Sequence, residues 1–144
     1  MIVCDWADNS VKVLSPDGTE LVQSFKGPHS FRSLTSAVYH EDKFFVLYET
    51  YGKVFNNEGL YLYDIGKEKP CDVRVISLEF TIDAFNNLIV CDTRNERLHL
   101  FSLDGKFVYT LNIEEIKSPS SVAAFEDNKL LVCDGKKHVV HVLQ

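Results

Sequence analysis

The stretch from Leu88 to Phe101 reads LIVCDTRNERLHLF, and its apolar run ending in Asp returns along the chain. The copies are Ile2-Val3-Cys4-Asp5, Phe45-Val46-Leu47-Tyr48, Ile89-Val90-Cys91-Asp92 and Leu131-Val132-Cys133-Asp134. Their last residues lie 43, 44 and 42 positions apart. A fixed period indicates one supersecondary unit repeated along the chain, and a period of this length is typical of a four-stranded β unit.

Further strands are predicted around each copy. Apolar and polar residues alternate from six residues after three of the Asp positions, at 11–14, 98–101 and 140–143, as in a half-buried strand. In the second copy the same alternation starts at residue 60, so residues 49–59 are predicted to form a loop with a six-residue insertion. Asp-Gly pairs at 17–18 and 104–105 are hairpin signals. They lead to extended runs at 20–25 and 106–111, and short apolar strands precede the later copies at 36–39, 80–85 and 121–125.

The sequence therefore predicts an all-β fold, a β-propeller segment of four-stranded antiparallel blades that form an incomplete ring. We expect one domain over residues 1–144 with fourteen strands. Its blades are expected at 1–27 (partial), 33–77, 78–113 and 119–144 (partial).

The third copy resembles the NHL repeat. Asp92 is followed by Asn95 and Arg97, by the alternating strand, and then by Asp104-Gly105-Lys106-Phe107. The first copy keeps Asp5 and an Asp-Gly turn, the fourth keeps Asp134, and the second has Tyr48 in place of the Asp. The resemblance implies a six-bladed propeller like the C-terminal domain of tripartite-motif (TRIM-NHL) proteins. Such domains recognise protein or RNA partners, so this segment would be the substrate-binding end of a ubiquitin ligase.

Six blades of roughly 42 residues each would require on the order of 250 residues, whereas the chain has 144. Three arrangements would cover the open blade faces: a longer parent chain, a second copy that joins the ring, or another protein that completes it. Because the repeat begins in the middle of a blade, we expect a partial product of a longer chain.

The net charge of the chain favours some classes of binding partner over others. A net charge of −6 disfavours phosphate backbones unless basic residues gather on one face, so protein ranks before RNA. An acid follows the first four residues, so neither a signal peptide nor a membrane span is predicted, and the expected location is the cytoplasm.

The repeated Cys and Asp residues are predicted to be structural. Cys4, Cys91 and Cys133 occupy equivalent positions in different blades and lack zinc-site spacing, so we expect reduced, packed thiols. Cys71 is the cysteine expected to be exposed, a candidate reactive thiol. We expect Asp5, Asp92 and Asp134 to accept backbone N–H bonds in their turns, with Arg97 pairing to Asp92.

Catalysis lacks candidate residues. The predicted innermost strands offer one carboxylate, Asp83, and no histidine, so no catalytic residue, metal or cofactor is expected, and a hydrolase or lyase fragment is the third hypothesis. His99 and His141 fall on alternate strand positions that are predicted to face outward.

Recognition is expected on the side where the turns after the Asp positions and the linkers between blades come together. Aromatic and Arg residues dominate protein interfaces, and the candidates there are Trp6, Arg32, Tyr51, Phe55, Arg94 and His138. Packing of Trp6 between blades is the structural alternative. For RNA, the residues expected to contact phosphates are Lys53, Arg94, Arg97, Lys136 and Lys137.

Overall fold

The structure is a computed structural model that describes residues 1–27, 34–48, 51–66, 79–126 and 129–144. Within these residues fourteen strands form four antiparallel sheets with three, four, four and three strands. The all-β fold class and the strand count predicted from the sequence are confirmed. The described residues include no helix with the length and apolarity needed to cross a lipid bilayer.

Strands that follow one another in the chain are neighbours within each sheet. Sheet 1 contains β1 (Ile2–Asp5), β2 (Ser10–Leu14) and β3 (Leu21–Lys26). Sheet 2 contains β4 (Leu34–His40), β5 (Lys43–Tyr48), β6 (Tyr51–Asn56) and β7 (Tyr61–Ile65). Sheet 3 contains β8 (Phe80–Ile82), β9 (Asn87–Asp92), β10 (Arg97–Ser102) and β11 (Phe107–Leu111), with the 3-10 turn η1 (Thr93–Asn95) before β10. Sheet 4 contains β12 (Pro119–Phe125), β13 (Lys129–Asp134) and β14 (Val139–Leu143).

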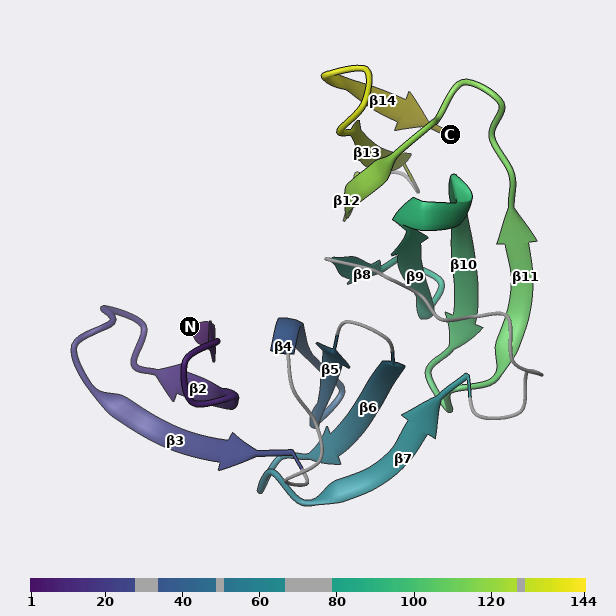
Figure 1. Cartoon of the computed structure of the whole chain (residues 1–144). Helices are drawn as coiled ribbons and strands as arrows, with labels where there is room; N and C mark the ends of the chain where they lie inside the picture. The colour runs from purple at the N-terminus through teal and green to yellow at the C-terminus, as the bar shows by residue number, and fades with distance from the viewer. Residues whose placement is uncertain (28–33, 49–50, 67–78, 127–128) are drawn as a thin grey trace.

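The four sheets follow one another around an arc, with β4, β8 and β12 on its inner side and β3, β7 and β11 on its outer side (Figure 1). One apolar cluster fills each space between consecutive sheets. Its members come from several strands of the two sheets that flank it, and within a strand they occupy alternating positions because successive side chains point to opposite faces of the sheet. The clusters include Val11, Val46 and Phe55 between sheets 1 and 2, Val54, Val90 and Phe101 between sheets 2 and 3, and Leu98, Leu100 and Val132 between sheets 3 and 4.

The predicted insertion in the second blade is wrong. β6 follows β5 after the two residues 49–50, and the alternation at 60–63 overlaps β7, the outer strand. The sequence hides β6 because Gly52 and Lys53 interrupt its apolar pattern. Ile65 of β7 occupies the space beside Gly52, where an added Cβ would lie 2.8 Å from the Ile65 Cδ1. Lys53 is buried because it forms an ion pair with Asp64.

The strand predicted at residues 80–85 ends earlier, at Ile82. The Asp83 carboxylate accepts hydrogen bonds from the backbone N–H of Phe85 (2.9 Å) and Asn87 (2.8 Å). These bonds hold a tight turn in place of strand pairing, as Asp side chains commonly do. The carboxylate assigned to the innermost strands therefore serves the turn between β8 and β9.

Candidate recognition face

A buried polar network closes the turn between β9 and β10. The buried Asp92 carboxylate accepts hydrogen bonds from the Asn95 amide (2.9 and 3.0 Å) and the Asn95 backbone N–H (3.3 Å). Arg97 Nε and His99 Nε2 each lie 3.0 Å from the same carboxylate. Burial raises the pKa of Asp92, but the hydrogen bonds from His99, Asn95 and Arg97 outweigh it and lower the pKa to about 2. The predicted pairing of Arg97 with Asp92 is present.

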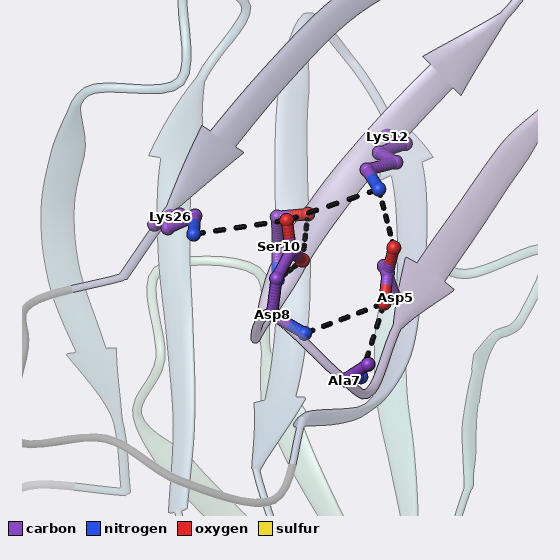
Figure 2. A network of polar contacts seen from close by, with 6 residues as sticks. All are labelled: Asp5, Ala7, Asp8, Ser10, Lys12 and Lys26. Carbon is purple, nitrogen blue, oxygen red and sulfur yellow. Dashed lines mark hydrogen bonds and ion pairs between the residues drawn. The ribbon is translucent and has the colours of Figure 1, made fainter.

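The equivalent turn of sheet 1 has the same design in a more exposed setting (Figure 2). Asp5 accepts bonds from the backbone N–H of Ala7 (3.0 Å) and Asp8 (3.4 Å), and it forms an ion pair with Lys12. The hydrogen bond from Lys12 lowers the pKa of Asp5. Asp8 in turn accepts the Ser10 N–H (3.1 Å), so the backbone of this turn is fixed at both ends.

Asp134 holds the third turn and a linker. It accepts the backbone N–H of Lys136 (3.0 Å), Lys137 (3.1 Å) and Lys117 (2.7 Å). The bond from the Lys117 N–H is the main reason that the pKa of Asp134 is lowered. Because Lys117 lies in the linker between sheets 3 and 4, one carboxylate joins the linker to the β13–β14 turn.

Two predictions about basic residues are wrong. His99 has no exposed side-chain surface, and His141 is half-buried on the side of sheet 4 that faces sheet 3. Lys53, assigned to phosphate contacts, is 6% exposed in β6. The physical reason is common to the three residues: each lies on a sheet face that a neighbouring sheet covers, so an alternate strand position does not lead to solvent.

These residues occupy one repeated position. Lys12, Lys53, His99 and His141 pair in register with the central Val of the strand before them. Each cation or imidazole has a carboxylate within reach: Asp5 for Lys12, Asp64 for Lys53, Asp92 for His99 and, at 3.8 Å, Asp134 for His141. Sheet 2 has Tyr48 where the other sheets have Asp, and the outer strand supplies Asp64 instead.

We define the turn face as the turns at residues 6–9, 93–96 and 135–138 together with the linker at 112–118. The linker is anchored on both sides. Thr93 Oγ1 donates to the Pro119 carbonyl (2.6 Å), and the Gly135 N–H donates to the Ser118 carbonyl (2.9 Å). Ile116 is 2% exposed within the core between sheets 3 and 4. Hydrogen bonds therefore hold the linker at 112–118 against the turns at 93–96 and 135–138.

The predicted binding residues are distributed unevenly over this surface. Trp6 is 78% exposed at the tip of its turn and does not pack between sheets. Arg94 and His138 are exposed in the other two turns. Phe55 was predicted to lie in a loop, and this is wrong: it is buried in β6, between sheets 1 and 2. Tyr51 begins β6, and Arg32 lies outside the described residues.

Sequence reasoning missed the part played by Ile116 and Lys117. Their signal is weak. Ile116 is a single apolar residue that follows two glutamates and precedes Lys-Ser-Pro, and such a sequence is typical of an ordinary polar linker. Only the fold brings the Lys117 N–H to Asp134, 17 residues away.

The cysteines are free thiols in the described part of the chain. Cys91 is fully buried, and Cys4 and Cys133 are half-buried. Burial raises the pKa of Cys4 to about 11 and that of Cys91 to about 12, so both carry their proton at neutral pH. Residues 1–27, 34–48, 51–66, 79–126 and 129–144 contain no group of three or more His, Cys, Asp or Glu placed to hold a metal ion. Cys71 lies outside these residues.

We expect acid to weaken the fold partly through Asp92. Its folded-state pKa of about 2 is below the ordinary value of 3.8, so its ionised form stabilises the protein above pH 3.8, and this contribution is lost as the pH falls toward 2. Urea unfolding of the wild type at a series of pH values should show a falling free energy of unfolding over this range. The Asp92→Asn variant, which has no group to titrate there, should show a shallower fall. Equal slopes for both proteins would contradict the assignment.

Comparison with known proteins establishes the fold. No protein-family model matches the sequence, and no curated protein does. A catalytically inactive virginiamycin B lyase from Staphylococcus aureus, solved with quinupristin, matches 94% of this chain and 48% of its own, with a TM-score of 0.70 at 11% identity. The WD40 β-propeller domain of Doa1 matches 99% of this chain and 49% of its own, with a TM-score of 0.64 at 16% identity.

The β-propeller domain of Cps50 (Swd1) from Myceliophteria thermophila matches 94% of this chain and 47% of its own, with a TM-score of 0.71 at 11% identity. The chain is therefore a β-propeller segment, and it spans about half the length of these three solved propellers. The NHL resemblance remains a prediction from the sequence.

Proposed function

We propose that this segment is a non-catalytic module that recognises a protein partner through its turn face. The observation that carries the proposal is Trp6, which is 78% exposed on a turn whose backbone is held by Asp5 and Asp8. A large aromatic side chain on a rigid turn loses little entropy on binding, and Trp is enriched among the residues that contribute most to protein interfaces. Arg94 and His138 extend the surface on the other turns.

The RNA alternative has fewer residues to draw on. Of the five basic side chains assigned to it, Lys53 is buried against Asp64 and Arg97 donates to Asp92. Lys137 donates from Nζ to the Glu115 carbonyl (2.5 Å). Arg94 and Lys136 do not make a basic patch large enough to overcome a net charge of −6. Titration of labelled single-stranded RNA should show no salt-sensitive binding, and binding that weakens steeply with salt would favour RNA.

By the resemblance to NHL repeats, we propose further that the module serves as the substrate-binding end of a ubiquitin ligase in the cytoplasm. Free thiols at Cys4, Cys91 and Cys133 fit a reducing compartment. We expect the full-length parent to transfer ubiquitin to the captured protein. We expect that transfer to be lost when this segment is deleted. Transfer that persists without the segment would contradict this finer role.

The Trp6→Ala variant tests the recognition role. Loss of the indole should weaken binding of a specific partner roughly tenfold to a hundredfold, because the exposed ring would be buried in the complex. The stability of the free chain should barely change, since the ring is mostly in water. The measurement is quantitative capture from a lysate of the source, followed by calorimetric titration of the purified partner.

Phe85→Ala is the matched control. Phe85 is 68% exposed, but it lies in the turn between β8 and β9, at the opposite end of the strands from the turn face. Its removal should leave capture unchanged. A partner lost equally with both variants, or with neither, would count against the turn face.

A further inference from the structure

The three interfaces between sheets repeat the same residue positions. We call the forward face of a sheet the side that packs on the next sheet in the chain, and the rear face the side that packs on the preceding one. Forward-face residues of sheets 1 and 3 are Ile2, Cys4, Val11 and Val13, and Ile89, Cys91, Leu98 and Leu100. Rear-face residues of sheets 2, 3 and 4 include Val46 and Lys53, Val90 and His99, and Val132 and His141.

Sheet 4 carries the forward-face pattern with no sheet upon it in the described chain. The repeat positions are filled by Leu131, Cys133, Val140 and Val142. Val140 and Val142 are 58% and 61% exposed, whereas their counterparts Leu98 and Leu100 are 1% and 3% exposed. With the half-buried Leu131 and Cys133, these two valines form an apolar strip on a sheet face, and an exposed apolar strip of this kind marks an interaction surface.

Sheet 1 carries the complementary rear-face pattern, and none of the described strands covers that face. Val3 is 37% exposed, against at most 2% for its counterparts Val46, Val90 and Val132. Beside it, Lys12 pairs with Asp5. This ion pair is no obstacle to burial, because the equivalent Lys53 is buried in the interface between sheets 1 and 2 with Asp64 as its partner.

We propose that the two uncovered faces bind a second copy of this chain, with the rear face of sheet 1 in one copy seated on the forward face of sheet 4 in the other. Each end holds one half of an interface that the chain already forms three times within itself. The length supports closure by two copies: one chain matches 47% to 49% of three solved propellers, so two copies supply about the length of one ring. An interface of this head-to-tail type closes only when the rotation per copy completes a circle.

The test is the mass of the 144-residue chain in solution, by light scattering coupled to gel filtration, at about 100 µM. The wild type should have twice the 16.4 kDa mass of one chain. Val140→Lys should restore the single-chain mass, because it places an unpaired charge in the interface. Val108→Lys is the control, since Val108 is 48% exposed on the outer strand β11, away from both faces, and it should remain a dimer.

A charge-rescue pair makes the contact specific. The counterparts of Val140 and Val3 lie in one cluster, since Leu98 and Val132 pack together between sheets 3 and 4. Val3→Glu alone should also give single chains. Mixing Val3→Glu with Val140→Lys should restore a dimer of one copy of each, because one interface then pairs Glu with Lys and the other is wild type. A wild-type monomer, a mass that Val140→Lys leaves unchanged, or a mixture that stays monomeric would overturn the proposal.

Discussion

Asp92→Ala is expected to lower the free energy of unfolding by roughly 3 to 5 kcal/mol, the usual cost of removing one partner of a buried charged pair. The substitution leaves His99, with no exposed side-chain surface, without the carboxylate that its Nε2 contacts. It also removes the acceptor for Asn95 and Arg97, so the turn between β9 and β10 loses the hydrogen bonds that hold it. Since single domains are stable by only about 5 to 15 kcal/mol, the variant should lie close to unfolding at room temperature.

Asp5→Ala is the matched control for this experiment, because Asp5 occupies the same repeat position in sheet 1. Its side chain and that of Lys12 are each 29% exposed, so water replaces the lost contacts. The loss of stability should be much smaller than for Asp92→Ala. Urea unfolding followed by far-ultraviolet circular dichroism measures both, and similar losses for the two variants would show that burial is not what makes Asp92 important.

Gly105→Ala is expected to destabilise the protein by roughly 3 kcal/mol, from about 1 to 2 kcal/mol of left-handed backbone strain and about 1 to 3 kcal/mol of overpacking. Gly105 has a φ of +83°, and an added Cβ would lie 2.7 Å from the carbonyl oxygen of Asp64. The atom it meets is backbone, and the Gly66 N–H donates to the Gly105 carbonyl (2.7 Å) nearby. Neither the backbone at Asp64 nor the backbone at Gly105 can therefore move away to relieve the contact.

Gly18→Ala separates these two causes. Gly18 lies in the equivalent Asp-Gly turn of sheet 1 with a φ of +76°, but an added Cβ would meet only the terminal methyl of Met1, at 3.0 Å. That flexible side chain can move, so about 1 kcal/mol of backbone strain should be the whole loss. Thermal unfolding of the two variants gives the comparison. A loss for Gly18→Ala as large as that for Gly105→Ala would mean that crowding by Asp64 contributes nothing.

Much of the fold is predictable from the sequence because the repeat is strong in sheets 1, 3 and 4. The Val-Cys-Asp strands and the Asp-Gly turns each depend on local chemistry, so their spacing alone predicts four sheets and fourteen strands. Sheet 2 was misread where Gly52 and Lys53 stand in β6. Their roles depend on Ile65 and Asp64, which are distant in sequence and become neighbours only when β7 pairs with β6.

The candidate site is less predictable, for a related reason. That Asp5, Asp92 and Asp134 would hold their turns follows from short-range hydrogen bonding, and the bonds are present. Exposure depends on what neighbouring sheets cover. An alternating strand pattern cannot distinguish His99 on a covered face from a surface histidine, and it gave no sign that Phe55 belongs to a buried strand.

The repeated position of Lys12, Lys53, His99 and His141 shows how the sheets of this chain keep one contact while their residues change. At this position each sheet has a side-chain nitrogen that can be protonated, with an acid near it. The acid comes from the preceding strand in three sheets and from the outer strand in sheet 2. From one sheet of this chain to the next, the pair therefore changes its residues and even the strand that supplies the acid. Comparing the repeats one position at a time therefore underestimates their similarity, whereas comparing the paired positions together recovers it.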